Sequence, residues 1–263
     1  MTPTLTRDRG LGRIEAVIFD LDDTLLDWSQ RAMSWEEHLQ PVIAGVHGYL
    51  RQEGYLSADS AESVTPLLIG QTFSATLRAN WANARETWVG VSMAGVWRQT
   101  FDALGLNDRP IDINAMLRAV DWRPMPGVVP YEDTAEILSA LRAQGYRLGL
   151  ITNSFQPMWL RDIELEAVGL VDYFEARITS GDTGFMKPHP AIYWRMLGLL
   201  NTTPERAVFV GDHPSYDIKG ARLTGLTSVL ICRPNVSREL EGNEPDFTIQ
   251  NLPQLLPILE QLG

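Results

Sequence analysis

The sequence predicts an α/β protein with a doubly wound, Rossmann-like parallel sheet as its core and an inserted helical second domain. Three observations lead to this prediction. Residues 16–19 form a short apolar run, which is typical of a strand buried on both faces. From about residue 131 onward, strand and helix patterns alternate, as in parallel sheets with right-handed crossovers. Between these regions, residues 28–119 show helical patterns and no further buried-strand run.

The N-terminal half is expected to contain one strand followed by helices. Residues 1–13 lack the apolar segment of a signal peptide, and we expect them to form a loose tail. Asp27 and Gln30 resemble a capping box, which predicts a helix that begins near Trp28. The helical segments expected in this half are 30–53, 58–70, 72–85, 90–105 and 111–119.

The C-terminal half is expected to hold most of the sheet. The prolines and glycine of residues 121–130 predict a linker. The strands expected after it are 146–152, 173–180, 207–211, 227–232 and 246–249. The helices expected around them are 131–144, 157–168, 190–200, 215–224 and a terminal helix from about residue 253. The sequence therefore predicts a core domain made of residues 14–27 and 120–263, interrupted by a helical domain of residues 28–119.

Composition narrows the possible partners. The formal net charge is -11, which disfavours nucleic acid and anionic membrane surfaces, since both require clustered Lys and Arg. Cys232 is the only cysteine, so an intrachain disulfide is impossible and a reducing cytoplasm is the expected location. No apolar stretch has the length of a membrane span. We expect a globular cytoplasmic protein that binds neither nucleic acid nor membrane; the sequence does not predict its oligomeric state.

Polar residues follow several of the predicted strands. Asp20 and Asp22 come directly after the first strand, Thr152 and Asn153 end the strand at 146–152, and Asp212 follows the strand at 207–211. In open parallel sheets, ligands bind at the carboxyl ends of the strands. Crowded carboxylates at the end of a buried strand repel one another, and such a local conflict is expected at a functional site.

Two further residues belong to this pattern. Lys187 lies in the segment FMKPHP, where Pro188 and Pro190 stiffen the loop by fixing φ. Asp217 follows Asp212 by five residues.

Four segments in this order, DLDDT, LIT, Lys187 in KPHP, and GDHPSYD, resemble the motifs of the haloacid dehalogenase superfamily of phosphohydrolases. The helical insertion lies between the first and second motifs, where that superfamily places its C1 cap. A lone DxDxT would be weak evidence, but four elements in order, each at a strand end or in its expected loop, are specific. The resemblance implies a Mg²⁺-dependent phosphatase that hydrolyses a small phosphorylated metabolite through an aspartyl-phosphate.

The resemblance also implies a role for each motif residue. Asp20 would be the nucleophile. Asp22 would protonate the leaving oxygen and then take a proton from the water that hydrolyses the intermediate. Thr152 and the Asn153 amide would donate hydrogen bonds to phosphoryl oxygens, and Lys187 would balance negative charge.

A bound metal ion would explain why several carboxylates crowd together at this site. A carboxylate that attacks a phosphate ester at about 3.5 Å, in an effective dielectric near 20, meets a repulsion of roughly 5 kcal/mol per unit charge. Mg²⁺ removes this repulsion, and its hard oxygen ligands would be Asp20, the backbone carbonyl of Asp22, and Asp212. Asp217 is expected to orient a water molecule at the metal or Lys187.

Three alternatives share parts of this pattern. A sugar phosphomutase has all four motifs. The motifs do not distinguish it from a phosphatase, because mutase behaviour depends on how the cap excludes water. A carbon–halogen dehalogenase works without metal and needs no general acid at the second aspartate, so Asp22 argues against it. A non-catalytic phosphoaspartate regulatory or binding module should be shorter, or should have lost a motif residue.

Substrate specificity is expected from the cap. Five tryptophans fall in or beside it, and their helical spacing favours cap core over pocket lining: Trp28, Trp35, Trp81, Trp88 and Trp97.

Overall fold

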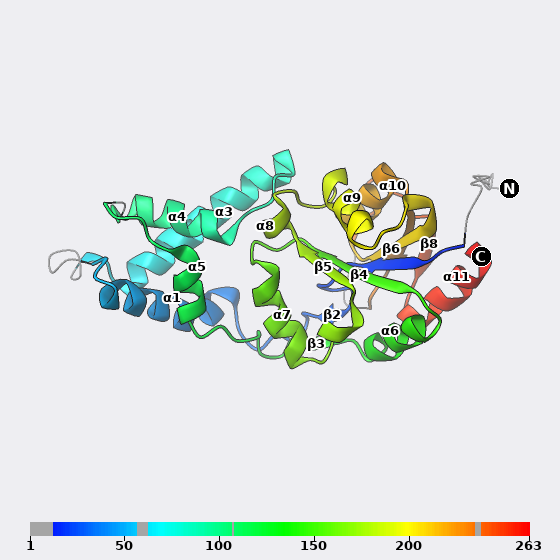
Figure 1. The fold of residues 1–263 in the computed structure, drawn as a ribbon, viewed down its shortest axis with the longest axis horizontal. Coiled ribbons are helices and arrows are strands. Elements are labelled where there is room, and N and C mark those ends of the chain that lie inside the picture. Colours follow the sequence, from blue (N-terminus) through cyan, green and yellow to red (C-terminus); the bar gives the residue numbers. More distant parts are fainter. Residues whose placement is uncertain (1–12, 57–62, 107, 235–237) are drawn as a thin grey trace.

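The computed structural model describes residues 13–56, 63–106, 108–234 and 238–263, so the tail expected at 1–13 lies almost wholly outside the described residues. At the centre is a parallel sheet of six strands in the order β5-β4-β1-β6-β7-β8 (Figure 1). The strands are β1 (Ala16–Phe19), β4 (Arg147–Thr152), β5 (Ala176–Thr179), β6 (Ala207–Gly211), β7 (Thr227–Ile231) and β8 (Phe247–Ile249). This sheet confirms the predicted doubly wound α/β fold.

Strand β1 lies in the middle of the sheet, between β4 and β6. Phe19 pairs with Leu150 of β4 on one side and with Val210 of β6 on the other. All four β1 residues are fully buried. Helices cover both faces of the sheet, which explains why β1 is a continuous apolar run rather than an alternating one.

The helices of the α/β part are arranged in two layers. On one face, α9 (Pro190–Leu199) and α10 (Lys219–Thr224) share a buried cluster with Ala16 and Ile18. On the other face, a second cluster contains Val17 and Phe19 together with side chains of α6 (Thr134–Ala143), α7 (Met158–Ala167) and α11 (Leu255–Leu262). Shorter elements are α8 (Ser180–Thr183), a π-helical turn (Pro214–Ile218) and 3₁₀ turns at Val171–Tyr173, Pro204–Arg206 and Leu252–Gln254.

Between β1 and β4 the described chain forms a helical region, at the left of Figure 1. Its helices are α1 (Trp35–Gln52), α3 (Pro66–Thr87), α4 (Met93–Ala103) and α5 (Ile113–Ala119). They surround their own apolar cluster, in which Val46, Phe73 and Trp97 are fully buried. At the base of this region, β2 (Leu26–Asp27) pairs antiparallel with β3 (Val129–Pro130), which lies within the segment expected to be a linker.

The start of the first helix differs from the prediction. The helix expected near Trp28 begins at Trp35, because Ser34 and Glu37 form a complete capping box. Two backbone N–H groups are satisfied reciprocally by such a box. Asp27 instead accepts a hydrogen bond from the backbone of Ser29 at 2.8 Å, which makes a local turn.

The break expected between residues 70 and 72 is also wrong, because α3 is continuous from Pro66 to Thr87. Gly70 lies inside this helix at a cost of about 1 kcal/mol relative to alanine. The fully buried side chains of Ile69 and Phe73, on either side of it, outweigh that cost. The predicted helix that began at residue 58 falls partly on residues outside the described part of the chain.

Backbone contacts hold the helical region against the α/β part. The N–H of Met93 donates to the carbonyl of Phe155 at 2.8 Å, and that of Gly90 donates to Gly184 at 2.9 Å. A Cβ atom on Gly90 would lie 2.1 Å from the carbonyl oxygen of Ser180, so only glycine permits this approach. The loops after β4 and β5 therefore position the helical region over the carboxyl end of the sheet.

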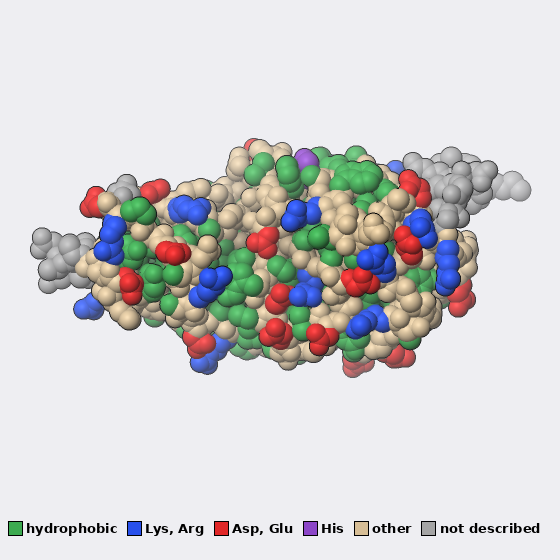
Figure 2. Space-filling model, in the orientation of Figure 1, with side chains coloured by type: hydrophobic (Ala, Val, Ile, Leu, Met, Phe, Trp, Pro, Cys, Tyr) green, Lys and Arg blue, Asp and Glu red, His purple; other side chains and the backbone are tan. Residues whose placement is uncertain are grey.

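Across the described chain, none of the helices combines the length and apolarity that a bilayer crossing requires. Figure 2 shows Lys and Arg side chains interspersed with Asp and Glu over one face of the molecule. On that face, charges of the two signs are mixed.

Candidate active site

Three carboxylates meet at the carboxyl end of the sheet. Asp20 follows β1, Asp212 follows β6, and Asp217 lies in the π-helical turn. One oxygen atom from each lies within 4.8 Å of the others, and all three side chains are buried. Neighbouring strands bring the first two together, since the N–H of Asp20 continues the ladder by donating to Val210 at 2.9 Å.

The close position of Asp217 depends on a glycine. Gly211 ends β6, and a Cβ atom there would lie 2.4 Å from Cγ of Asp217. The Asp217 carboxylate therefore folds back against the strand where any larger residue would collide with it. It accepts a hydrogen bond from the backbone N–H of His213 at 2.9 Å, while the Tyr193 hydroxyl donates to the Asp217 carbonyl at 3.3 Å.

Lys187 joins this cluster from its loop. Its ammonium group forms ion pairs with Asp20 and with Asp217, the latter at 2.7 Å, although the side chain is only 3% exposed. Burial acts to lower the pKa of Lys187, but the two carboxylates outweigh it, and the pKa is raised above its ordinary value. Lys187 thus remains a buried cation between two acids.

Asn153 holds the loop that carries Lys187. Its side-chain amide donates to the carbonyl of Lys187 at 3.1 Å and accepts from the N–H of the same residue at 2.8 Å. This two-way pairing is a positioning role that the sequence did not indicate. Because the side-chain amide is engaged with Lys187, the backbone N–H of Asn153 is the group expected to donate a hydrogen bond to a phosphoryl oxygen.

The acidic cluster favours a further cation. Burial raises the pKa of Asp20 well above its ordinary value, although Lys187 opposes this and the neighbouring carboxylates add to it. Burial and then Asp217 raise the pKa of Asp212 to about 6, against the effect of Arg238. Buried carboxylate oxygens at this spacing fit a divalent cation such as Mg²⁺, which would lower both pKa values.

Two residues of the cluster were not identified from the sequence. Arg238 donates from Nε to the Asp212 carboxylate at 2.6 Å. The fully buried Thr24 donates to Asp20 at 3.0 Å and lies 3.5 Å from an oxygen of Asp212. The only sequence signal for Thr24 was its place in DLDDT, and for Arg238 the sequence carried no signal.

Asp22 lies apart from the three clustered side chains. Its carboxylate accepts hydrogen bonds from Arg161 at 2.6 Å, from the Trp28 indole at 2.7 Å and from the Thr152 hydroxyl at 3.3 Å. Thr152 therefore lies at the strand end where it was expected, with its hydroxyl directed to Asp22.

Arg161 is the main residue of the site that sequence reasoning missed. It lies on α7, is buried, and forms a second ion pair with Glu164 at 2.7 Å. Burial acts to lower the pKa of Arg161, but Asp22 and Glu164 outweigh it and raise the pKa. Burial also raises the pKa of Glu164 to about 6. An arginine on the buried face of a helix is rare unless it is paired, but the sequence alone did not reveal its partner.

Comparison with known proteins identifies the family. A family model described as haloacid dehalogenase-like hydrolase matches residues 14–225, a range that includes all four motifs. The chain belongs to this family. It is therefore a hydrolase of the haloacid dehalogenase type, as the resemblance of its motifs predicted.

Individual relatives cover nearly the whole chain. A glyceraldehyde 3-phosphate phosphatase from Pyrococcus furiosus is 29% identical over 260 residues, which are 95% of this chain and 94% of the relative. A phosphoserine phosphatase from Thermus thermophilus is 28% identical over 249 residues, 91% of this chain and 96% of the relative. The crystal structure of a phosphatase of the same superfamily from Thermococcus onnurineus is 29% identical, with a TM-score of 0.56, and covers 94% of this chain and 98% of its own.

In this haloacid dehalogenase-like hydrolase, Asp22 lines a cavity of about 480 Å³. The cavity lies between the α/β part and the helical region, and we call it the catalytic cavity. Its walls include Trp28, Trp35, Trp81, Asn153, Gln156 and Arg161. The side-chain amide nitrogen of Gln156 is buried and has no hydrogen-bond partner among the described residues. A donor left unpaired in such a wall is typical of a site that binds ligand or water.

The tryptophans of the helical region divide into two groups. Trp97 is fully buried in the apolar cluster of the helical region, as its helical spacing favoured. Trp28, Trp35 and Trp81 line the catalytic cavity, which is the alternative to core packing, and Trp35 and Trp81 also pack against the apolar cluster. Helical spacing could not separate the two roles, since a side chain can pack on a core with one edge and face a ligand with the other.

Proposed function

We propose that this hydrolase is a Mg²⁺-dependent phosphatase that cleaves the phosphate monoester of a small metabolite through an aspartyl-phosphate intermediate. The observation that carries this proposal is the meeting of Asp20, Asp212 and Lys187 at the carboxyl ends of β1 and β6. Relatives that align with nearly the entire chain are named phosphatases, which supports the proposal.

In the proposed metal site, Asp20, Asp212 and the backbone carbonyl of Asp22 would hold Mg²⁺. The Asp217 carboxylate pairs with Lys187 through Oδ1 and with the His213 N–H through Oδ2. Through its ion pair with Lys187, Asp217 would orient that lysine beside the nucleophile. When bound, Mg²⁺ would offset the repulsion of roughly 5 kcal/mol between the nucleophile and the phosphate.

Asp20 would attack phosphorus. Its carboxylate is held from two sides, by Lys187 on Oδ1 and by Thr24 on Oδ2. Such fixed donors pre-organise a nucleophile and add little reorganisation cost during the reaction. Lys187, Thr152 and the backbone N–H of Asn153 would then stabilise negative charge on the transferred phosphoryl group.

Asp22 would serve as the general acid and base. Asp22 lines the catalytic cavity together with Trp28 and Arg161. A leaving group in that cavity would therefore place its bridging oxygen near Asp22. The contacts to Trp28, Arg161 and Thr152 would hold the carboxylate in place for protonation of the leaving oxygen and later activation of water.

We further propose that the helical region is a cap domain, residues 28–119, over a core domain of residues 14–27 and 120–263. The separate apolar cluster of α1, α3, α4 and α5 supports this division. Phe155, Leu160 and Met186 of the α/β part also belong to that cluster, so the two domains would pack closely.

Phosphate release from a panel of phosphorylated metabolites and from p-nitrophenyl phosphate tests the function. We expect release in the presence of Mg²⁺, loss of release with EDTA, and recovery when Mg²⁺ is added back. Phosphatase activity that resists the chelator would contradict the metal role. Transfer of the phosphoryl group between sugar hydroxyls without release of phosphate would favour a phosphomutase instead.

A further inference from the structure

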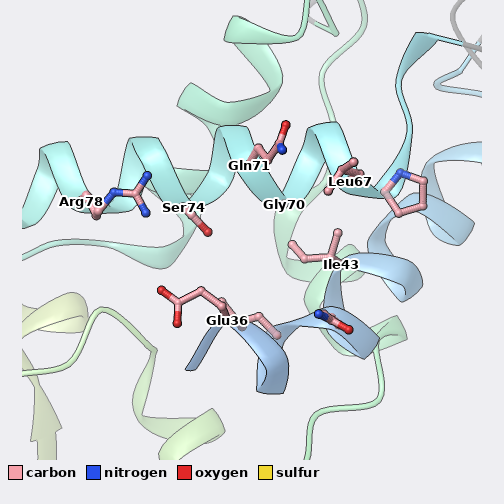
Figure 3. A pocket seen from close by; sticks show the side chains of 10 residues that line it. Glu36, Ile43, Leu67, Gly70, Gln71, Ser74 and Arg78 are labelled. Atoms are coloured by element: carbon pink, nitrogen blue, oxygen red, sulfur yellow. The ribbon is translucent and has the colours of Figure 1, made fainter. Parts of the chain in front are cut away.

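A second cavity of about 530 Å³ adjoins the catalytic cavity and lies between α1 and α3; we call it the α1–α3 groove (Figure 3). Four residues line both cavities: Glu36, Leu39, Ser74 and Arg78. The groove therefore borders the catalytic cavity, which Asp22 also lines.

The walls of the groove are mainly apolar. Leu39 and Ile43 come from α1, while Pro66, Leu67 and Gly70 come from α3. Leu67 is 70% exposed, and Figure 3 shows Ile43 facing the stretch of α3 that contains Gly70. A Cβ atom at Gly70 would lie 3.7 Å from Ile43, an ordinary van der Waals distance, so a side chain at this position would occupy space that the glycine leaves open between the two helices.

The end of the groove nearest the catalytic cavity is charged. Glu36 and Arg78 lie toward this end, opposite Leu67 (Figure 3). Both are exposed, and within the described residues neither forms an ion pair or a side-chain hydrogen bond. A ligand that passes from one cavity to the other would meet an unpaired donor and an unpaired acceptor before it reaches the apolar walls.

We propose that the substrate is an amphipathic phosphate monoester whose leaving group has an apolar end bound in the α1–α3 groove. This inference rests on the proposed phosphatase function and names its substrate class. Each cavity alone has the size of a site for a drug-sized ligand, about 300 to 1,000 Å³. A three-carbon leaving group would occupy only the catalytic cavity, whereas a longer one would reach past Glu36 and Arg78 to Ile43 and Leu67.

A series of n-alkyl phosphates from ethyl to octyl tests the proposal by kcat/KM with Mg²⁺. Once the chain is long enough to enter the groove, each buried methylene should raise kcat/KM about fourfold, which is roughly 250-fold for the four methylenes between butyl and octyl. Gly70→Leu should fill the groove and abolish this dependence on chain length. Gly48→Leu is the matched control, because Gly48 lies on α1 and a Cβ atom there has no neighbour within 4 Å.

Leu67→Ser provides a second variant at an exposed position, where folding is not at risk. It should reduce the preference for octyl over butyl phosphate several-fold. If p-nitrophenyl phosphate is hydrolysed but kcat/KM does not change with chain length, the groove proposal is overturned while the phosphatase function stands.

If no ester is hydrolysed, the phosphatase function is refuted. A binding measurement then tests separately whether the α1–α3 groove binds an apolar chain. Calorimetry with Mg²⁺ would then compare ethylphosphonate with octylphosphonate. Tighter binding of octylphosphonate that Gly70→Leu removes would still support the groove as an apolar site. Equal affinities for the two phosphonates would overturn it.

Discussion

The buried acidic cluster at the sheet and the helical wall of the catalytic cavity are built in opposite ways. On the sheet side, Lys187 and Asp217 are buried and each is paired with another charge of the cluster. On the helical side, Glu36 and Arg78 are exposed and have no charged partner among the described residues. Buried, paired charges can adopt few arrangements and suit one fixed reaction, whereas exposed, unpaired charges remain available to different ligands.

This contrast predicts where substitutions should have large effects. Electrostatic interactions are strong where water is excluded and weak where it is not. Changes on the sheet side should therefore lower kcat by orders of magnitude or shift stability with pH. Changes on the helical side should alter selectivity or local stability while the chemical step is preserved.

The largest effect is expected from Asp20→Asn, which removes the proposed nucleophile. Turnover should fall by at least about 10⁴-fold without loss of the fold, because the amide is a poor nucleophile of similar shape. Steady-state kinetics and circular dichroism would measure the two properties. Asp27→Asn is the control, since that carboxylate only caps a local turn, and near-native turnover by Asp20→Asn would remove Asp20 from the mechanism.

Asp22→Asn should slow turnover by about 10² to 10⁴-fold and leave Mg²⁺ binding intact. The asparagine can still meet Trp28 and Arg161 but cannot transfer a proton to the leaving oxygen. The comparison between substrates sharpens the result, because an ester with a good leaving group such as p-nitrophenol needs less acid assistance and should lose less rate. An equal rate for variant and wild type would mean that the general acid lies elsewhere.

Asp212→Asn should change how stability depends on pH. The pKa of Asp212 is raised in the folded protein from 3.8 to about 6. The folded state therefore holds the proton more tightly between these values, and the wild-type free energy of unfolding should fall as pH rises from about 4 to about 6. Asparagine does not ionise, so above pH 6 without Mg²⁺ the variant should be more stable than wild type, by up to about 3 kcal/mol.

Urea denaturation at a series of pH values would measure this difference. Added Mg²⁺ should stabilise the wild type at pH 7 and have little effect on the variant, since one of its proposed ligands is gone. Parallel stability curves for the two proteins from pH 4 to pH 8 would contradict the burial of an ionisable Asp212 in the cluster.

The smallest effect is expected on the helical side, from Ser34→Ala. This substitution removes the capping box of α1 and should lower the free energy of unfolding by about 1 kcal/mol. Hydrolysis of p-nitrophenyl phosphate should keep its wild-type kcat, because Ser34 contacts neither the acidic cluster nor Lys187. A loss of kcat as large as that of Asp22→Asn would break the proposed division between a catalytic sheet side and a selective helical side.

Local patterns predicted the sheet side well. The apolar run at 16–19, the strand at 207–211 and the polar residues that follow them all lie where they were expected. The reason is that a parallel sheet aligns the ends of its strands, so residues directly after neighbouring strands must meet. The helical side was predicted less well, because capping by Ser34 and the continuity of α3 through Gly70 depend on competing local signals and on buried packing.

By itself, the sequence determined the α/β class, the family motifs and the carboxylates that could bind a cation, since each follows from short-range order along the chain. Only the tertiary structure decided which charges pair. Arg161 meets Asp22 across 139 positions of sequence, and Arg238 meets Asp212 through a separate loop. It likewise decided that the space beside Gly70 adjoins the catalytic cavity, because a cavity is formed by side chains that no single segment contains.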